Sequence, residues 1–221
     1  MEQIRNDVKA HSSPFYLTLV SIIQSFALGF LLSTIGMELK ASSSLFWPLT
    51  LQSLVAWLQV TAVFQAIVLT WAVNVSNAIV FRRVVGLTDS YIPFVFAVIQ
   101  FFLVVFIAPP RIGPWFVAEG AFCAAAVWAF IDMYGKDMKE TENKERFDAL
   151  NSYKIFNIPY QYFVPRYISL VGVVFLITGS WFIYSVPNVT ISLMGVLGVN
   201  VLFFVFALLH RQSWQNLTAK A

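Results

Sequence analysis

The sequence predicts an all-α integral membrane protein, built as a bundle of about six transmembrane helices with both termini in the cytoplasm. Of its 221 residues, 59% are hydrophobic and 11% are charged, whereas soluble domains carry about 25% charged residues. A soluble fold of this length could not bury so much apolar surface, but a bilayer accepts it on the outside of helices. We therefore expect one polytopic domain, residues 1–221, in contact with lipid.

Six stretches are long and apolar enough to cross about 30 Å of hydrocarbon, which takes about 20 helical residues. They cover residues 15–36, 49–73, 91–108, 115–133, 167–184 and 190–210. Turn-forming residues separate them, as expected for breaks between helices. These breaks fall at residues 12–14, 47–48, 86–89, 109–114 and 187–188. The first stretch is longer than the apolar region of a signal peptide and no cleavage site follows it, so we expect a retained span.

The positive charges alternate with the spans. If the N-terminus is cytoplasmic, the segments on that side hold 12 of the 14 Lys and Arg residues, and only Lys40 and Arg111 lie on the other side. This is the distribution that the positive-inside rule describes. A miscounted span would destroy the alternation, so the charges support both six spans and the orientation with both termini inside.

Three features extend beyond a plain bundle. Residues 49–83 contain no Pro or Gly, so the second helix could reach about 50 Å and should tilt or project into the cytoplasm. The fourth helix either continues inward or gives way to a solvated loop in the charged segment at about 135–166. Residues 156–167 combine aromatic rings with prolines, which predicts an elbow in the cytoplasmic interface.

Polar side chains recur along the second span with helical spacing. A stripe about 80° wide holds only small or polar residues and Val63. Such a stripe should face another helix, a symmetry mate or water rather than lipid. Its members are Gln52, Ala56, Gln59, Val63, Ala66, Thr70, Asn74 and Asn77.

Four spans place amide side chains near the middle of the membrane. These amides are Gln24, Gln59, Gln65, Gln100 and Asn200. Because amides both donate and accept hydrogen bonds, two interpretations stay open. The amides could join helices to one another, at about 0.6 kcal/mol each, or they could line a route for an ion, water or a small polar solute.

Glu119 is the one acidic residue that lies clearly within a span, about one turn below the outer surface. An ionisable residue inside a membrane is a functional candidate by default. We expect Glu119 either to attract cations at an outer mouth or to reach interfacial water.

Small residues suggest close helix packing in two spans. Ala118, Ala121, Ala125 and Ala129 recur at short helical intervals beside Gly120, and Gly195 and Gly198 lie in the last span. Small residues let helix backbones approach closely. They could serve packing within one chain or a subunit interface in a homo-oligomer.

Enzymatic chemistry finds little support. The two histidines, His11 and His210, lie at helix ends, and no HExxH, GxSxG or P-loop motif occurs. We expect no catalytic residue, cofactor or metal site. The single cysteine, Cys123, excludes an internal disulfide and should be a buried, unreactive thiol. The net charge is +3, but the Lys and Arg residues are not clustered with aromatic residues on a solvated face. We therefore expect no nucleic-acid partner.

Two functions remain. The first, which the polar stripe favours, is an oligomeric channel or carrier for an ion or small polar solute. The second is a non-transporting anchor, sensor or scaffold that recruits a soluble cytoplasmic protein. Its docking surface would include Arg82, Arg83, Lys136, Lys139, Lys144 and Arg146. Short loops and the absence of targeting signals favour a bacterial inner membrane.

Overall fold

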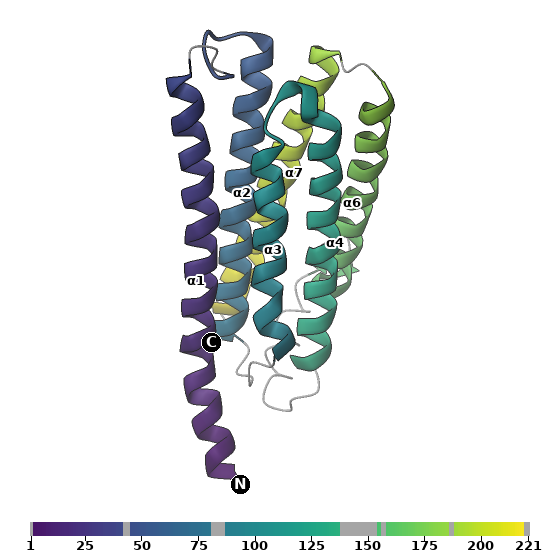
Figure 1. Ribbon diagram of the computed structural model, residues 1–221. Helices are drawn as coiled ribbons and strands as arrows, with labels where there is room; N and C mark the ends of the chain where they lie inside the picture. The colour runs from purple at the N-terminus through teal and green to yellow at the C-terminus, as the bar shows by residue number, and fades with distance from the viewer. Residues whose placement is uncertain are drawn as a thin grey trace.

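The computed structural model describes residues 2–41, 45–80, 87–137, 154–155, 158–185 and 188–218. Six helices dominate them (Figure 1). Their bounds are α1 Glu2–Lys40, α2 Leu51–Val80, α3 Leu87–Val105, α4 Ile112–Asp137, α6 Tyr160–Tyr184 and α7 Val189–Thr218. A 3-10 turn, Pro109–Arg111, precedes α4, and two antiparallel two-residue strands, β1 Lys154–Ile155 and β2 Ile158–Pro159, precede α6.

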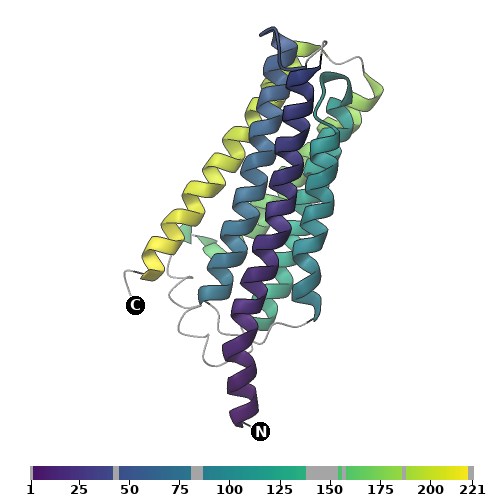
Figure 2. The same cartoon turned by 60° about the vertical axis from the view of Figure 1, so that its left-hand side comes forward.

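The helices run alternately up and down, so both termini lie at one end of the bundle (Figures 1 and 2). We call this the terminal end and the opposite one the distal end. Lys40 and Arg111 lie at the distal end, where α1 stops and α4 begins. The first turns of α1 project beyond the other helices at the terminal end (Figure 1).

The helices confirm an integral membrane bundle. Five of them are long and apolar enough to cross a bilayer, namely α1, α2, α4, α6 and α7. In α3 the apolar part is shorter, Ser90–Val105, because Pro109 and Pro110 follow soon after and cannot continue a helix. The predicted overlong second helix is confirmed, since the 30 residues of α2 span about 45 Å. Residues 81–83 lie outside the described part of the chain.

Two predicted helix starts were wrong. α1 begins at Glu2 and passes through Pro14 instead of starting there. α6 begins at Tyr160 and includes Pro165, so most of the predicted elbow at 156–167 is helical. A proline removes one backbone hydrogen bond, but the rest of a long apolar helix easily compensates for that loss in a membrane, where any break exposes more unpaired groups. α4 extends to Asp137, four residues beyond its predicted end.

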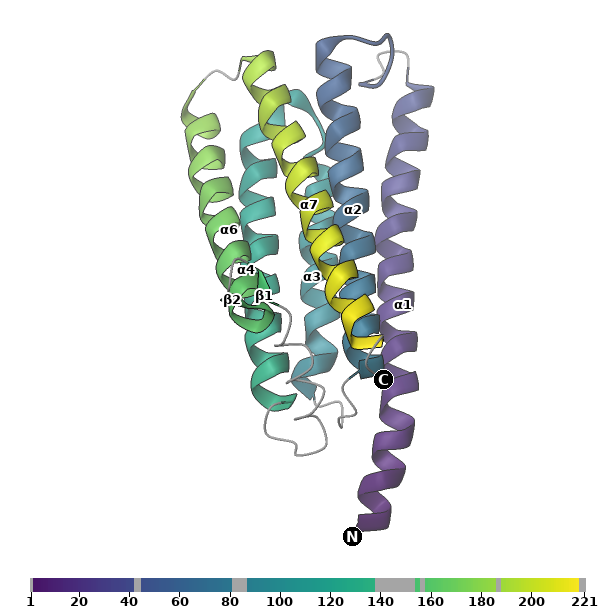
Figure 3. The same cartoon turned by 180° about the vertical axis from the view of Figure 1, so that it is seen from behind.

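The bundle divides into two packing units. α4 packs most extensively against α6, whereas α2 packs against α7 and α1, and α1 also packs against α3. α3 packs against α4 as well, and so connects the two units. Of the described helices, α6 has α4 as its only extensive helical neighbour. Figure 3 shows α7 crossing obliquely over α2, with α6 beside α4 on the far side. We call α4 and α6 the arm, and α1, α2, α3 and α7 the body.

Glycines allow the two arm helices to touch backbone to backbone. A Cβ placed on Gly113 would lie 3.2 Å from the carbonyl oxygen of Gly179, and one on Gly179 would lie 3.0 Å from that of Gly113. Gly120 follows Gly113 by seven residues on α4, and Gly172 precedes Gly179 by seven on the antiparallel α6. A Cβ on Gly120 would lie 3.2 Å from the carbonyl oxygen of Gly172. Such spacing leaves no room for any side chain, so the sequence of glycines fixes the register of the arm.

The predicted small-residue positions only partly match this contact. Ala118, Ala125 and Ala129 are buried inside the bundle, whereas Ala121 is exposed on the outside of α4. In α7, a Cβ on Gly195 would lie 2.9 Å from the ring of Phe116, and nothing comes within 4 Å of one on Gly198. Most of these residues therefore serve packing within one chain.

The glycine contact predicts an asymmetry between two alanine substitutions. Gly179→Ala would place its methyl group 2.8 Å from the backbone nitrogen of Val117, and backbone cannot move away as a side chain can. We expect a loss of about 1–3 kcal/mol of stability and a lower melting temperature in detergent. Gly198→Ala, the matched control, should be neutral or stabilising, because alanine favours helix by up to about 1 kcal/mol. Equal melting temperatures for the two variants would contradict the close contact.

Candidate functional site

The predicted stripe on α2 faces the interior along most of its length. Ala56, Gln59, Val63 and Ala66 are fully buried, and Thr70 and Asn74 are almost so. Gln52 is exposed at the distal end, so the stripe does not continue to that surface. Asn77 is partly buried and lies near the terminal end of the helix.

Hydrogen bonds join the terminal half of the stripe to two other helices. The Tyr16 hydroxyl of α1 donates to Oδ1 of Asn74 at 2.6 Å, and the Gln100 amide of α3 donates to Oγ1 of Thr70 at 3.2 Å. Asn74 itself donates to the Thr70 carbonyl at 2.7 Å. Gln100, one of the mid-membrane amides, therefore joins α3 to α2, and Asn74 of the stripe joins α2 to α1.

Asn200 makes a similar link between α7 and α2. Its amide nitrogen donates to the carbonyl oxygens of Leu58, at 3.0 Å, and Val196, at 2.9 Å. Both hydrogens are thus used, and the Asn200 side-chain oxygen has no partner. In the membrane this oxygen can only accept.

Several other buried polar atoms also lack a partner within the described part of the chain. Both amide atoms of Gln24 and of Gln59 have none, and neither has Oε1 of Gln65 or Gln100. An unpaired buried polar group costs about 1–3 kcal/mol. These groups are therefore the best-placed ones to bind water or a solute.

Glu119 is the strongest case. Its side chain is completely buried, and neither carboxylate oxygen has a hydrogen-bond partner among the described residues. The side chain therefore points into the bundle and not toward interfacial water, whereas the expected attraction of cations stays a prediction. A buried carboxyl group requires either a proton or a positive partner.

Two contacts place Glu119 at the same level as Asn200. Phe116, on the distal side of Glu119, meets α7 at Gly195, and Phe122, on the terminal side, meets α7 at Phe203 with ring centroids 6.0 Å apart. Because α4 and α7 run in the same direction, the residues of α7 beside Glu119 are those midway between these two contacts, which includes Asn200. Acceptor oxygens from both units thus occupy one layer.

A cavity of about 80 Å³ lies on the terminal side of this layer. We call it the intramembrane pocket. Its body side comes from residues 69–77 of α2, Phe96 of α3 and residues 202–206 of α7, and its arm side comes from residues 122–130 of α4 and 167–171 of α6. The pocket therefore lies on the boundary between arm and body, where α6 and α7 barely touch.

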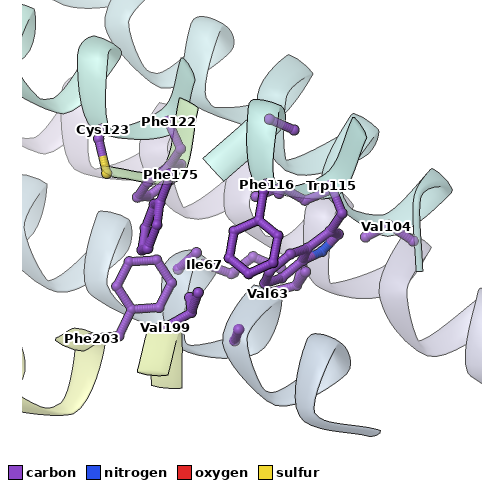
Figure 4. Close-up of a cluster of buried hydrophobic side chains, with 14 of the residues drawn as sticks. Val63, Ile67, Val104, Trp115, Phe116, Phe122, Cys123, Phe175, Val199 and Phe203 are labelled. Atoms are coloured by element: carbon purple, nitrogen blue, oxygen red, sulfur yellow. The ribbon is translucent and has the colours of Figure 1, made fainter. Parts of the chain in front are cut away.

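The pocket wall combines aromatic rings with a polar strip. The rings are those of Phe96, Phe122, Phe130, Tyr167, Phe203 and Phe206. The strip consists of Thr70, Asn74 and Asn77 on α2, and the Tyr167 hydroxyl has no partner among the described residues. Figure 4 shows Phe122, Phe175 and Phe203 on the same side of the cluster as Cys123, which also lines the pocket.

Sequence patterns did not reveal this pocket. The stripe contributed three of its residues, but the aromatic rings come from four helices and look like ordinary lipid-facing or core residues in the sequence. Cys123 is buried as predicted. No group of three or more His, Cys, Asp or Glu residues that could hold a metal ion occurs within the described residues.

The predicted cytoplasmic docking surface lies almost wholly beyond what the structure describes. Arg82, Arg83, Lys139, Lys144 and Arg146 are outside the described residues. Lys136 belongs to α4, but its side chain is also outside the described part. The geometry of the site therefore concerns only the interior of the bundle.

The hydrogen bond between Tyr16 and Asn74 predicts an energetic coupling. In a double-mutant cycle, the loss of unfolding free energy in the double variant Tyr16→Phe/Asn74→Leu should differ from the sum of the two single losses by about 0.6 to 1.7 kcal/mol. The unfolding free energies are measured by SDS titration of the purified protein. The control pairs Asn74→Leu with Tyr91→Phe, because Tyr91 is 57% exposed on α3, and its cycle should be additive. Additivity in both cycles would show that the bond contributes nothing.

No protein-family model, curated protein or solved structure matches the chain. Helical membrane bundles host many unrelated functions, so function has to be argued from the site itself.

Proposed function

We propose that this membrane protein is a small carrier that binds its solute in the intramembrane pocket. The observation that carries the proposal is the position of the pocket on the boundary between arm and body. Carriers commonly hold the substrate between two helical units, and rocking of one unit against the other exposes the site to each side in turn.

The contacts between the arm and α7 suit such a movement, in which α4 would turn against α3, the body helix that it packs against extensively. Within the arm, glycine backbones are in direct contact, so α4 and α6 should move as one piece. Between arm and α7 the contacts are made by long aromatic side chains, as in Phe116 against Gly195 and Phe122 against Phe203. Rings can change rotamer and partner at much lower cost than a backbone contact can separate.

The unpaired polar groups extend from the pocket toward the distal end. Glu119 lies one helical turn from Cys123 on the same face of α4, and Asn200 of α7 lies at the same level of the bundle. Trp115 and Phe116 follow, and both are completely buried, so they would close the distal route in this state. A solute leaving on the distal side would pass Glu119 first.

A carrier explains these features better than an open channel or a scaffold. A channel along the α2 stripe would require Gln52 and Gln59 to line one route, but Gln52 is exposed and Gln59 is absent from the pocket wall. A scaffold gives no role to a buried carboxylate and a pocket. The pocket lies within one chain, so transport does not require the homo-oligomer that the sequence suggested, nor any catalytic step.

We further propose that the terminal end faces the cytoplasm of a bacterial cell. Arg166 and Arg211 lie toward that end, whereas Lys40 and Arg111 lie at the distal end. This arrangement agrees with the positive-inside rule. The solute in the present state would then enter from the cytoplasmic side.

The proposal predicts one-sided access to the pocket. Cys123 is the single cysteine of the chain, and it should react with the membrane-impermeant thiol reagent MTSET in inside-out vesicles but much more slowly in right-side-out vesicles. In a Cys123→Ala background, Ala126→Cys should react in the same way, because Ala126 lines the pocket. Mass spectrometry of the purified chain measures the extent of reaction.

The matched control is Ala121→Cys in the same background. Ala121 is on the same helix but exposed on the outside of the bundle, where lipid should prevent reaction with a charged reagent. Equal reaction of Cys123 from both sides would overturn the carrier in favour of a channel. No reaction from either side would mean a dry, closed interior and would leave the scaffold.

A further inference from the structure

We infer that the solute of the intramembrane pocket is a small alkylammonium cation. This inference rests on the proposed function, because it names the class of solute for the same pocket. The lining residues, ring content and size of the pocket favour this class of solute, together with the unpaired oxygens beside the pocket.

No positive charge lines the pocket, since no Lys, Arg or His is among its lining residues. Glu119 lies one turn beyond the lining residue Cys123 and is completely buried, with no cationic partner within the described residues. A cation that enters the pocket would supply the positive partner that an ionised carboxylate needs. An anion would find no such partner among the lining residues.

The unpaired atoms near the pocket are mainly acceptors. Oε1 of Gln100 lies on the amide that is bonded to the pocket residue Thr70. The side-chain oxygen of Asn200 lies in the layer of Glu119 and can only accept, and the amide nitrogen of the same side chain already donates both of its hydrogens. Oxygens with partial negative charge stabilise a cation at short range in a low-dielectric interior.

The ring content favours an alkylated cation over a metal ion. Six aromatic side chains line the pocket. The ring of Phe122 makes edge contacts with the rings of Phe96 and Phe203, with ring centroids 5.2 Å and 6.0 Å apart. Ring faces attract cations that have lost their water, and quaternary ammonium ions are the usual ligands of such aromatic sites. A metal ion would need several oxygen ligands in direct contact, which this mostly apolar wall lacks.

The size of the cavity limits the ligand. Its volume of about 80 Å³ is about half the 150 Å³ or so of a cavity that holds benzene. A trimethylammonium group with a short tail is at least as large as benzene, so its binding requires the arm to move away from the body. A large aromatic dye would require a greater movement. A hydroxyl on that tail could bond to Asn74 or Asn77 of the polar strip.

The test uses choline and its uncharged analogue of the same shape, 3,3-dimethylbutan-1-ol. Either ligand is titrated into the detergent-solubilised full chain, and the rate at which N-ethylmaleimide modifies Cys123 is followed by mass spectrometry. Choline should slow the reaction with saturation, and the neutral analogue should need at least a tenfold higher concentration. Equal protection by the two compounds would overturn the inference, because the pocket would then select shape and not charge. No protection by choline would overturn it as well.

Two pairs of variants identify the groups responsible. Glu119→Gln keeps the shape of the side chain and should raise the half-protecting choline concentration at least tenfold, whereas Glu38→Gln near the distal end of α1 should not change it.

Phe203→Leu should raise the half-protecting choline concentration between about twofold and thirtyfold. Phe203→Tyr keeps an aromatic ring and should bind choline nearly as well as the unchanged chain. The control Phe204→Leu changes a ring that is 59% exposed and should have no effect. Unchanged protection in Glu119→Gln would remove the carboxylate from the site.

The inference and the proposed function fail in different ways. If choline protects Cys123 in detergent but liposomes containing the protein take up no choline, the ligand class stands and the carrier fails. If MTSET reaches Cys123 from the terminal side only but choline gives no protection, the carrier stands and the ligand class fails.

Discussion

The contact between α4 and α6 determines how the rest of the bundle is arranged. Four glycines, two on each helix and seven residues apart, bring the helices so close that an added methyl group would lie within 3.0 Å of an atom of the other helix at each of them. No other pair of described helices is in such extensive contact. Because the inward face of α6 packs against α4, it cannot also pack against α7. The intramembrane pocket lies where α6 and α7 are not in close contact.

The second constraint comes from the bilayer. A polar group in the membrane interior has no bulk water to bond with, so each buried donor and acceptor needs a partner in the chain, a bound water or a ligand. Tyr16, Asn74, Thr70 and Gln100 satisfy most of their needs within one network. Glu119 and Gln59 do not satisfy theirs. The difference separates the part of the polar interior that holds helices together from the part that is open to a solute.

Hydropathy predicted the number of helices because contact with lipid requires apolar residues along the whole length of a span. Helix ends were predicted less well, since a proline such as Pro14 or Pro165 breaks a short soluble helix more readily than a long apolar one. The glycine contact was missed because it joins two segments that are distant in the sequence. Gly113 and Gly120 allow a close contact only because Gly179 and Gly172 lie opposite them. For the same reason the sequence identified Glu119 but not its surroundings. Which way a side chain on α4 points depends on where α6 packs.

Stability alone gives no reason to keep a carboxyl group at position 119. Replacing a buried ionisable group by an apolar one of similar volume is often neutral or stabilising, and leucine would fill this space between Phe116 and Phe122 without an unpaired oxygen. The same holds for the amide of Gln59, which bonds to nothing in the described structure. A bundle that served only as an anchor would gain by losing both. A protein that admits a cation between arm and body would not, because the groups that cost stability in the empty state are those that the solute needs when it is bound.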